Sequence, residues 1–215
     1  MSSAIESLPF LWQGLLVTLE VSLLVVAISL VIGVVMGIGI TYGPAWLYWP
    51  IRLYSDLIRG IPVLVLIFFV YYGLPALGLN LDNFSAAVAA LAAFKTAHVI
   101  EITRGAIQSI HHGQTDAGKA IGLTFWQRMF HVIFPQATRR FLPPWINAVT
   151  DAVKGSALVS LIGVVDLMLA VQKVIGRTYE PMPLYVTGAI IYFAINYSLS
   201  LQSRRLEKRF AYIRE

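Results

Sequence analysis

Three long stretches without a charged side chain or a histidine constrain this chain more than any other feature of its sequence. They run from Val21 to Ile51, from Gly60 to Leu81 and from Pro181 to Ser203. Each stretch is long enough to span a membrane, because about 20 helical residues cross a hydrocarbon core about 30 Å thick. Only 13% of the 215 residues are charged, against roughly a quarter in an ordinary soluble domain. The composition therefore excludes a soluble fold.

Two further stretches, Asn83–Ile110 and Phe141–Val171, are also apolar and long enough to span, although each carries charges near its middle. The sequence thus predicts an all-α integral membrane protein with five transmembrane helices in a single domain, residues 1–215. The first span is expected to be retained, because the segment before it lacks the basic region of a signal peptide. The expected spans are residues 10–41, 57–75, 84–110, 141–171 and 183–204.

The first predicted span and the segment after it carry two local signals. Gly33 and Gly37 form a small-x-x-x-small pair that would allow close approach of another helix. Ordinary use of glycine in membrane helices explains the pair equally well. Trp46, Tyr48 and Trp49 then indicate a loop in the headgroup layer, where aromatic rings are enriched.

The distribution of Lys and Arg predicts the orientation, because basic residues accumulate on the cytoplasmic side. The predicted outside segments at residues 1–9 and 76–83 contain no Lys or Arg. The last predicted outside loop contains Lys173 and Arg177, whose charges are partly offset by Glu180. Apart from Lys95, Arg104 and Lys154, which lie within spans, the rest lie in or next to the other segments between spans and in the C-terminal tail: Arg52, Arg59, Lys119, Arg128, Arg139, Arg140, Arg204, Arg205, Lys208, Arg209 and Arg214. We therefore expect the N-terminus outside and the C-terminus in the cytoplasm. The net charge of +5 is then a topology signal that requires no nucleic-acid partner.

The sequence contains no set of residues for redox, metal or bond-making chemistry. Cysteine is absent, and the four histidines lack the spacing of metal ligands. No nucleophile with a base and no paired carboxylates stand out. We expect no enzymatic activity, no cofactor and no metal on this chain.

Residues 111–135 form a polar, partly amphipathic segment in this otherwise hydrocarbon-like sequence. Gly113 to Lys119 fits G-x-x-x-x-G-K, the first seven positions of a phosphate-binding P-loop. A P-loop requires Ser or Thr next, where this chain has Ala120, and a buried strand before the glycines. Residues 101–110 have helical apolar spacing instead. Nucleotide binding by this chain is therefore rejected.

The same segment has the pattern of a short docking helix. Thr115 or Asp116 can cap it, and Gly122 can end or bend it. The small residues Ala117, Gly118 and Ala120 make one side thin, and Pro135 closes the segment. Apolar residues recur at spacings of three or four: Leu123, Trp126, Met129, Phe130 and Ile133. Amphipathicity leaves two interpretations open, insertion into a groove of a partner protein and a helix lying on the membrane interface.

Ionisable residues inside spans are costly, so each is a functional candidate. In the third predicted span, Glu101 and Arg104 are helical neighbours, which favours a structural ion pair. Lys95 and His98 lie deeper and are candidates for a translocation path, although snorkelling or core packing explains them equally well.

The fourth predicted span contains Asp151, Lys154, Gly155 and Ser156. This segment combines the charge of Lys154, the flexible backbone of Gly155 and the hydroxyl of Ser156, which competes for backbone hydrogen bonds. The combination predicts a break in the helix. Irregular backbone at membrane depth is tolerated where it is buried in protein or lines a wet cavity. Residues 151–157 are therefore a candidate gate or substrate-lining element.

Segment 111–135 resembles the EAA loop of integral-membrane permeases of ATP-binding-cassette (ABC) importers. Asp116-Ala117-Gly118, Gly122 and Pro135 stand at the family's spacing. More of the chain is similar to the polar amino acid permease subfamily, which serves histidine, glutamine, glutamate, arginine and opines. The matching stretches cover nearly the whole chain: Thr18–Ser22, Ile58–Pro62, Tyr71–Pro75, Glu101–Ile110, Phe134–Ala137, and Pro143-Pro144 with Asn147.

The resemblance implies a type I ABC importer permease fold in the bacterial cytoplasmic (inner) membrane. It also implies a second permease subunit, identical or related, two copies of a separate ATPase that carry ATP and Mg, and an external solute-binding protein that delivers an amino acid. Coupling to the ATPase would fall on Asp116, Ala117, Gly118, Gly122, Phe125 and Pro135. Candidates for the path or gate are Lys95, His98, Glu101, Asp151, Lys154 and Ser156.

The chain departs from the family's pattern in three regions. Asp116 and Gly118 replace the usual Glu and Ala, which preserves charge and small size. His98 replaces the usual Tyr, and Lys154–Leu158 replaces a Lys-Asp-Thr-Ser-Leu pattern, so the transported amino acid stays open. The alternative function is a passive channel or a membrane scaffold with an interfacial helix.

Overall fold

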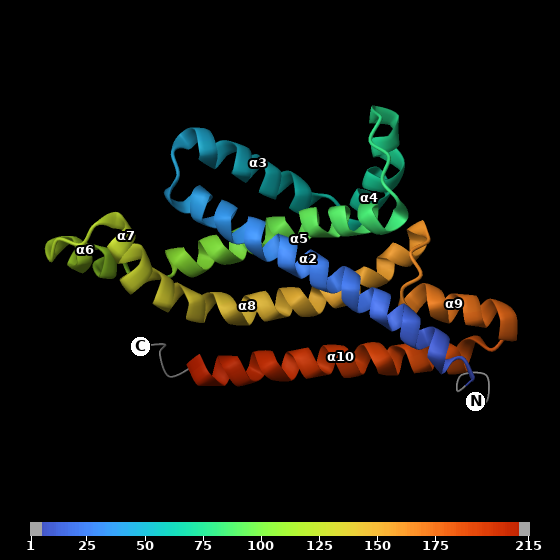
Figure 1. The fold of residues 1–215 in the computed structure, drawn as a ribbon. Coiled ribbons are helices and arrows are strands. Elements are labelled where there is room, and N and C mark those ends of the chain that lie inside the picture. Colours follow the sequence, from blue (N-terminus) through green and yellow to red (C-terminus); the bar gives the residue numbers. More distant parts are fainter. Residues whose placement is uncertain (1–5, 211–215) are drawn as a thin grey trace.

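The computed structural model describes residues 6–210, and every secondary-structure element in that part of the chain is helical (Figure 1). The predicted all-α fold class is confirmed. Three helices are long and apolar enough to cross a membrane: α2 (Leu8–Tyr42), α5 (Asn83–Gln108) and α10 (Pro181–Phe210). Two bent helix pairs raise the number to five, as predicted, when each pair counts as one span.

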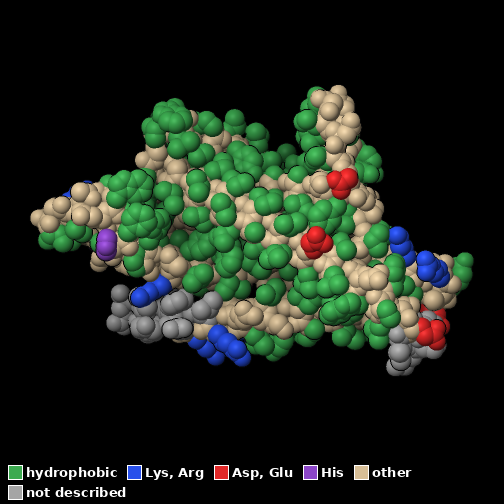
Figure 2. Space-filling view, viewed as in Figure 1, with side chains coloured by type: hydrophobic (Ala, Val, Ile, Leu, Met, Phe, Trp, Pro, Cys, Tyr) green, Lys and Arg blue, Asp and Glu red, His purple; other side chains and the backbone are tan. Residues whose placement is uncertain are grey.

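The long helices run side by side along one direction of the molecule (Figure 1). Helices α6 (His112–Ala120) and α7 (Phe125–Arg128) lie at one end, here called the α6 end. Helix α9 (Leu167–Thr178) lies at the other, the α9 end. Figure 2 shows that hydrophobic side chains cover most of this face and that basic ones lie toward the two ends. This pattern suits a bundle that crosses a membrane along its long direction.

Glycines let α2 and α5 pack closely against each other. A Cβ atom at Gly33 would lie 2.6 Å from the Cβ of Val99, and one at Gly37 would lie 2.5 Å from the Cβ of Thr103. Both distances are far shorter than a van der Waals contact, so neither position admits a side chain without moving α5. The small-x-x-x-small pair therefore serves helix packing, one of the two interpretations that the sequence left open.

Helix α3 (Ala45–Gly60) replaces the predicted loop in the headgroup layer. It packs along α5, where the Tyr54 hydroxyl donates to the carbonyl oxygen of Ala93 at 2.7 Å. Trp46 and Trp49 lie exposed on its outer side. The loop prediction was wrong because aromatic residues signal the membrane interface in a helix as well as in a loop.

The second predicted span, residues 57–75, is divided in the structure. Helix α3 ends at Gly60, and α4 (Val63–Phe68) follows at an angle of 106° after Ile61 and Pro62. A π-helical turn η1 (Phe69–Gly73) and a 3₁₀ helix η2 (Leu74–Leu77) complete this segment. The residue before a proline is disfavoured in the α-helical conformation, which explains the break at Ile61.

The fourth predicted span, residues 141–171, is also a bent pair. Helix α8 (Phe134–Gly155) gives way at Ser156 to the 3₁₀ helix η4 (Ser156–Ile162). The change of helix type confirms the interruption predicted from Lys154-Gly155-Ser156. Gly163, with φ of 86°, ends η4, and α9 continues at 49° to the preceding helix.

Candidate functional site

The tip of the molecule, residues 111–128, contains most of the residues that were predicted to couple to a partner. His111 is the N-cap of α6, and its Nδ1 accepts a hydrogen bond from the amide of Gly113 at 3.0 Å. The predicted cap at Thr115 or Asp116 is therefore wrong, because the helix starts several residues earlier. Residues 112–120 are helical, so the G-x-x-x-x-G-K string does not form a phosphate-binding loop.

Gly122 ends α6 in the left-handed conformation, with φ of 79°. Its amide donates to the carbonyl oxygen of Lys119, and the amide of Leu123 donates to that of Gly118, both at 2.9 Å. These two bonds form the Schellman motif that commonly ends helices at glycine. Of the two roles predicted for Gly122, ending the helix or bending it, the structure shows the first.

Arg128 holds α7 against the thin side of α6. A Cβ atom at the buried Gly118 would lie 2.9 Å from Cδ of Arg128. The Nη1 atom of Arg128 donates to the carbonyl oxygen of Leu123 at 2.5 Å, which fixes the side chain in place. Thr124 and Gln127 form a capping box that starts α7 immediately after the turn. The angle between the two short helices is thus set by Gly118, Gly122 and Arg128.

One side-chain hydrogen bond and one aromatic contact join the tip to the bundle, and a second hydrogen bond joins α8 to the end of α5 next to the tip. Arg140 of α8 donates to the carbonyl oxygen of Ser109 at 2.6 Å, and Gln136 of α8 donates to Gln114 of α6 at 3.4 Å. The ring of Phe125 meets Tyr42 of α2 edge to face, with 5.4 Å between ring centroids. A displacement of the tip would therefore also displace the neighbouring ends of α2, α5 and α8.

Pro135 does not close the segment, contrary to the prediction. It lies in the first turn of α8, directly after the π-helical turn η3 (Met129–Ile133). Proline is tolerated in a first helical turn because its missing N–H has no partner there. The chain is consequently helical from Phe125 through Ile162, so the tip is continuous with a membrane helix.

The outward side of the tip combines small, charged and apolar residues. Asp116 and Ala117 are exposed, and the Asp116 carboxylate lies 3.1 Å from Nζ of Lys119. Ile121 and Trp126 expose 76% and 64% of their surface. A short helix with a thin side and exposed apolar residues at its end fits a groove on a protein.

A second group of predicted residues lies where α5 and α8 meet, and we call Lys95, His98, Asp151 and Lys154 the polar face. Asp151 and Lys154 are 3.8 Å apart, and their side chains are 63% and 61% exposed. The charges of Asp151 and Lys154 interact electrostatically with the Lys95 side chain. The charges of Lys95 and Asp151 interact in the same way with the His98 ring. The structure thus brings four of the six path candidates together.

Glu101 lies elsewhere, in a cluster of basic side chains. Its carboxylate is 2.6 Å from Arg104, which confirms the predicted ion pair. Arg52 and Arg59 of α3 lie 3.5 and 3.9 Å from the same carboxylate. These two arginines were predicted only to mark the cytoplasmic side, with no partner, because much of α3 was expected to be a loop. Glu101 joins α3 to α5.

Ser156 is buried and belongs to a polar cluster that sequence reasoning missed. Its hydroxyl donates to the carbonyl oxygen of Val153 at 2.8 Å. Nearby, the Tyr192 hydroxyl lies 3.3 Å from the Asp166 carboxylate, and the Thr18 hydroxyl accepts a hydrogen bond from the amide of Leu167 at 3.0 Å. Asp166 also accepts from the amide of Leu169 at 2.9 Å and so caps α9. The capping signal of an Asp before an apolar helical pattern could have revealed it.

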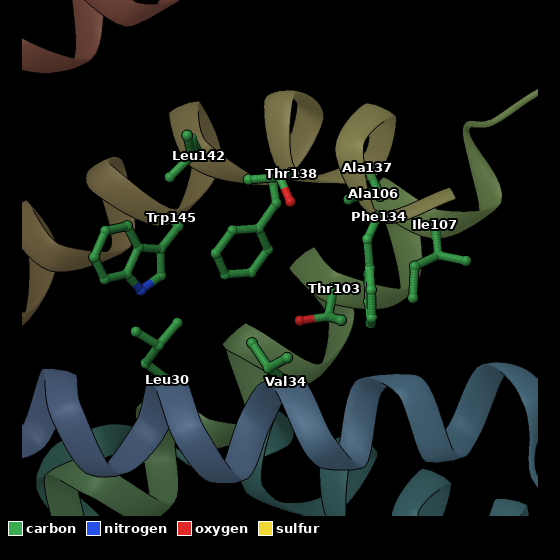
Figure 3. Close-up of a pocket in the computed structure, with 11 residues that line it drawn as sticks. Leu30, Val34, Thr103, Ala106, Ile107, Phe134, Ala137, Thr138, Leu142 and Trp145 are labelled. Carbon is green, nitrogen blue, oxygen red and sulfur yellow. The ribbon is translucent and has the colours of Figure 1, made fainter. Parts of the chain in front are cut away.

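A cavity of about 400 Å³ lies between α2, α5 and α8, apart from the polar face. Figure 3 shows Leu30 and Val34 from α2 opposite Trp145 and Leu142 from α8, with Thr103 of α5 between them. Its lining holds no charged side chain. Within residues 6–210, no three His, Asp or Glu side chains are grouped so that they could hold a metal.

The fold and these sites define a helical membrane protein with an exposed helical tip at one end. Comparison with protein families matches residues 29–212 to the "Binding-protein-dependent transport system inner membrane component" family. The chain therefore belongs to this family of inner-membrane proteins.

Three relatives align over nearly their whole length. YckA of Bacillus subtilis, a probable amino-acid ABC transporter permease protein, is 37% identical over 97% of this chain and 92% of its own. The glutamine transport system permease protein GlnP of Escherichia coli K12 is 37% identical over 94% of each chain. The arginine transport system permease protein ArtQ of Bacillus subtilis is 31% identical over 97% of this chain and 95% of its own.

Two solved structures with similar folds support the family assignment. The crystal structure of an amino acid ABC transporter with histidines superposes with a TM-score of 0.90 and 33% identity, covering 95% of this chain and 96% of that one. The inward-facing MetNI methionine ABC transporter shares the fold, with a TM-score of 0.73 at 20% identity over 92% of this chain and 96% of that one. The type I ABC importer permease fold is thus confirmed.

Proposed function

We propose that this chain is one of two permease subunits of an ATP-driven importer for a polar amino acid or a related compound. The names of its relatives, among them glutamine and arginine permeases, support this substrate class. The observation that carries the proposal is the tip, an exposed short helix whose angle is fixed by Gly118, Gly122 and Arg128. A passive channel has no need of such a rigid external element.

The tip is the proposed contact with the ATPase. Each of two copies of a separate ATPase, which binds ATP and Mg, receives one tip in a groove. Asp116, Ala117, Gly118, Gly122, Phe125 and Pro135 are the proposed coupling residues. Movement of the ATPase would pass through the contacts of Phe125 with Tyr42 and of Gln114 with Gln136 into the bundle. The helices would then tilt and alternate access to the path.

The proposed orientation places the α6 end in the cytoplasm. Lys119, Arg128, Arg139 and Arg140 lie in or next to the tip, and the basic residues of the last turns of α10 lie at the same end (Figure 1). The excess of basic residues at one end supports this assignment, because Lys and Arg are retained on the cytoplasmic side. An external solute-binding protein would then meet the α9 end.

The polar face is the proposed lining of the translocation path. Charged side chains at membrane depth almost always face water, a partner or the interior of a bundle. Asp151 and Lys154 are exposed here, so a path between this chain and the second permease accounts for them. An amino acid carries an ammonium and a carboxylate, which match Asp151 and Lys154 in charge. Lys95 and His98 would extend this lining, while Glu101 and Ser156 would act as gate elements that fix α3 and η4.

Uptake in proteoliposomes tests the path. The permease would be reconstituted with its ATPase and binding protein, and uptake of labelled amino acids measured for Asp151→Asn and Lys154→Gln. We expect the KM for uptake to rise about tenfold or more, since a hydrogen bond to a charged group contributes about 1.5–3 kcal/mol. Lys173→Gln on α9, also an exposed lysine, serves as the control. Unchanged kinetics in both path variants would exclude the polar face as the lining.

A further inference from the structure

The cavity between α2, α5 and α8 is an apolar site that the proposed transport does not use. Its volume is about 400 Å³, and its lining combines aliphatic and aromatic side chains with two threonines. Leu30 and Val34 of α2 lie opposite Leu142 and Trp145 of α8 (Figure 3). A lining of this kind offers water few hydrogen-bond partners, so the cavity suits an apolar ligand.

The cavity lies on the side of α8 that is turned away from the proposed path. Trp145 of the lining and Lys154 of the polar face are nine residues apart on α8. Nine residues make about two and a half helical turns, so the two side chains lie on opposite sides of the helix. Beside the cavity, Val31 and Val35 of α2 each expose 65% of their surface. With the second permease on the side of Lys154, this apolar side of the subunit faces lipid.

The part of the cavity that α2 lines lies within the hydrocarbon core. Helix α2 has 35 residues and is about 52 Å long, so a core about 30 Å thick and centred on it leaves about 11 Å of helix outside at each end. Counted from Tyr42, which meets the tip, Val34 lies about 12 Å and Leu30 about 18 Å along the helix. A tilted helix has still more of its length inside the core. The cavity therefore begins close to the headgroup layer at the α6 end and extends inward.

Two polar side chains without partners stand beside the cavity on α8. Arg139 follows Thr138 of the lining directly, and it lies three residues before Leu142, so Arg139 and Leu142 share a face of the helix. Arg139 is exposed, and within residues 6–210 it forms no ion pair and no hydrogen bond. The Thr138 hydroxyl also makes no hydrogen bond in that part of the chain, whereas that of Thr103 donates to the carbonyl oxygen of Val99 at 2.8 Å. Basic pockets between membrane helices at the cytoplasmic side bind anionic lipid headgroups.

We propose that the cavity binds one acyl chain of an anionic phospholipid from the cytoplasmic leaflet. The chain would lie between Leu30 and Trp145, with the ester group near the Thr138 hydroxyl and the phosphate at the Arg139 guanidinium, whose planar set of donors matches phosphate. This inference rests on the proposed function for the side of α8 that faces lipid, and it adds a lipid ligand to the subunit. Because α2 and α8 both extend to the tip, a lipid between them would stabilise their relative position.

Photolabelling in proteoliposomes that contain the complete transporter tests the site. Phosphatidylglycerol with a photoreactive group in the middle of one acyl chain would be mixed into the bilayer, and phosphatidylcholine with the same chain would be compared in parallel. Labelled residues would be mapped by mass spectrometry. We expect residues 141–145 of α8 to be labelled several-fold more strongly than Phe193 of α10, which is 66% exposed. Their labelling by phosphatidylglycerol should exceed that by phosphatidylcholine about fivefold, the effect of one basic residue on an anionic headgroup.

Two matched pairs of variants separate the acyl chain from the headgroup. Val34→Phe fills the cavity, whereas Val31→Phe adds the same volume to the exposed side of the same helix. Only Val34→Phe should remove the excess labelling of residues 141–145. Arg139→Gln removes the charge beside the cavity, whereas Arg204→Gln removes an exposed arginine of α10 toward the same end. Only Arg139→Gln should abolish the preference for phosphatidylglycerol.

Labelling of residues 141–145 equal to that of Phe193 would overturn the proposal, and so would a lack of labelling there, which is the result if a second protein covers the cavity. Equal labelling by the two lipids would refute the anionic headgroup. ATP-dependent uptake in the same proteoliposomes separates these outcomes from failure of the proposed function. Uptake without labelling of the cavity refutes only the lipid site, and labelling without uptake supports the site and refutes the proposed transport.

Discussion

Replacing Gly122 should uncouple the tip without unfolding the membrane bundle. Gly122 has φ of 79°, and a Cβ atom built there has no other atom within 4 Å. The cost of substitution is therefore backbone strain alone, about 1–2 kcal/mol for an ordinary residue in the left-handed region. This corresponds to about a 5–30-fold loss in the population of the native tip geometry.

A graded series makes this prediction specific. Asn tolerates the left-handed conformation better than other residues, so Gly122→Asn should retain the most coupling, Gly122→Ala less, and the β-branched Gly122→Val the least. ATP hydrolysis stimulated by the loaded binding protein would be measured in nanodiscs, together with co-purification of the ATPase. Thermal stability of the permease should change little, because the turn lies outside the core clusters.

Gly176→Ala on α9 is the matched control. Gly176 is also exposed and a Cβ atom there meets nothing within 4 Å, but the residue lies within a helix. Alanine is favoured over glycine in a helix by about 1 kcal/mol, so coupling should be unchanged. If Gly122→Val couples as well as the native chain, or if the series does not follow the cost of the left-handed conformation, the coupling role of the turn is refuted.

Three substitutions test the packing of the bundle by thermal unfolding in detergent. Glu101→Gln should destabilise by about 1–2 kcal/mol, since the three arginine contacts lose a charged acceptor but are partly screened by solvent; an unchanged Tm would show that the cluster does not join α3 to α5. Gly37→Val should cost about 1–3 kcal/mol by overpacking against Thr103, and a neutral effect would contradict the close α2–α5 contact. Tyr192→Phe should cost about 1 kcal/mol, because Asp166 loses a donor; equal stability would argue against the buried cluster.

The helices that hydropathy alone determines were predicted well. Helix α2 begins two residues before the expected position 10 and ends one residue after 41, and α5 and α10 begin within two residues of expectation. Long apolar runs predict such helices because the bilayer sets their length. The helical break at Ser156 was also predictable, since it depends on the local sequence Lys154-Gly155-Ser156.

The elements that depend on tertiary contacts were not predictable from the sequence. Helix α3 is held by Tyr54 and by the arginines that meet Glu101, a residue that lies far away in sequence. Pro135 continues a helix because a π-helical turn precedes it. No residue pattern in the sequence predicts that turn. The buried Asp166 and the half-buried Tyr192 meet across two helices, and their pairing leaves no periodic signal.

The sequence predicted more about the coupling residues than about the path residues. Gly122 was predicted to end or to bend the short helix, and the structure shows that it ends it. The grouping of Lys95 with Asp151 was not visible, because it depends on how α5 and α8 pack. The assignment of Asp116 to coupling still rests on the resemblance and on its exposed position on α6.

Accumulation of a labelled amino acid in proteoliposomes tests the central claim most directly. The permease would be reconstituted with its ATPase, with ATP and the binding protein supplied together, separately or not at all. We expect accumulation above the external concentration only when both are present, and loss of accumulation in Gly122→Val. Downhill flux of the same amino acid that is independent of ATP and unaffected by Gly122→Val would contradict the claim and identify a passive channel.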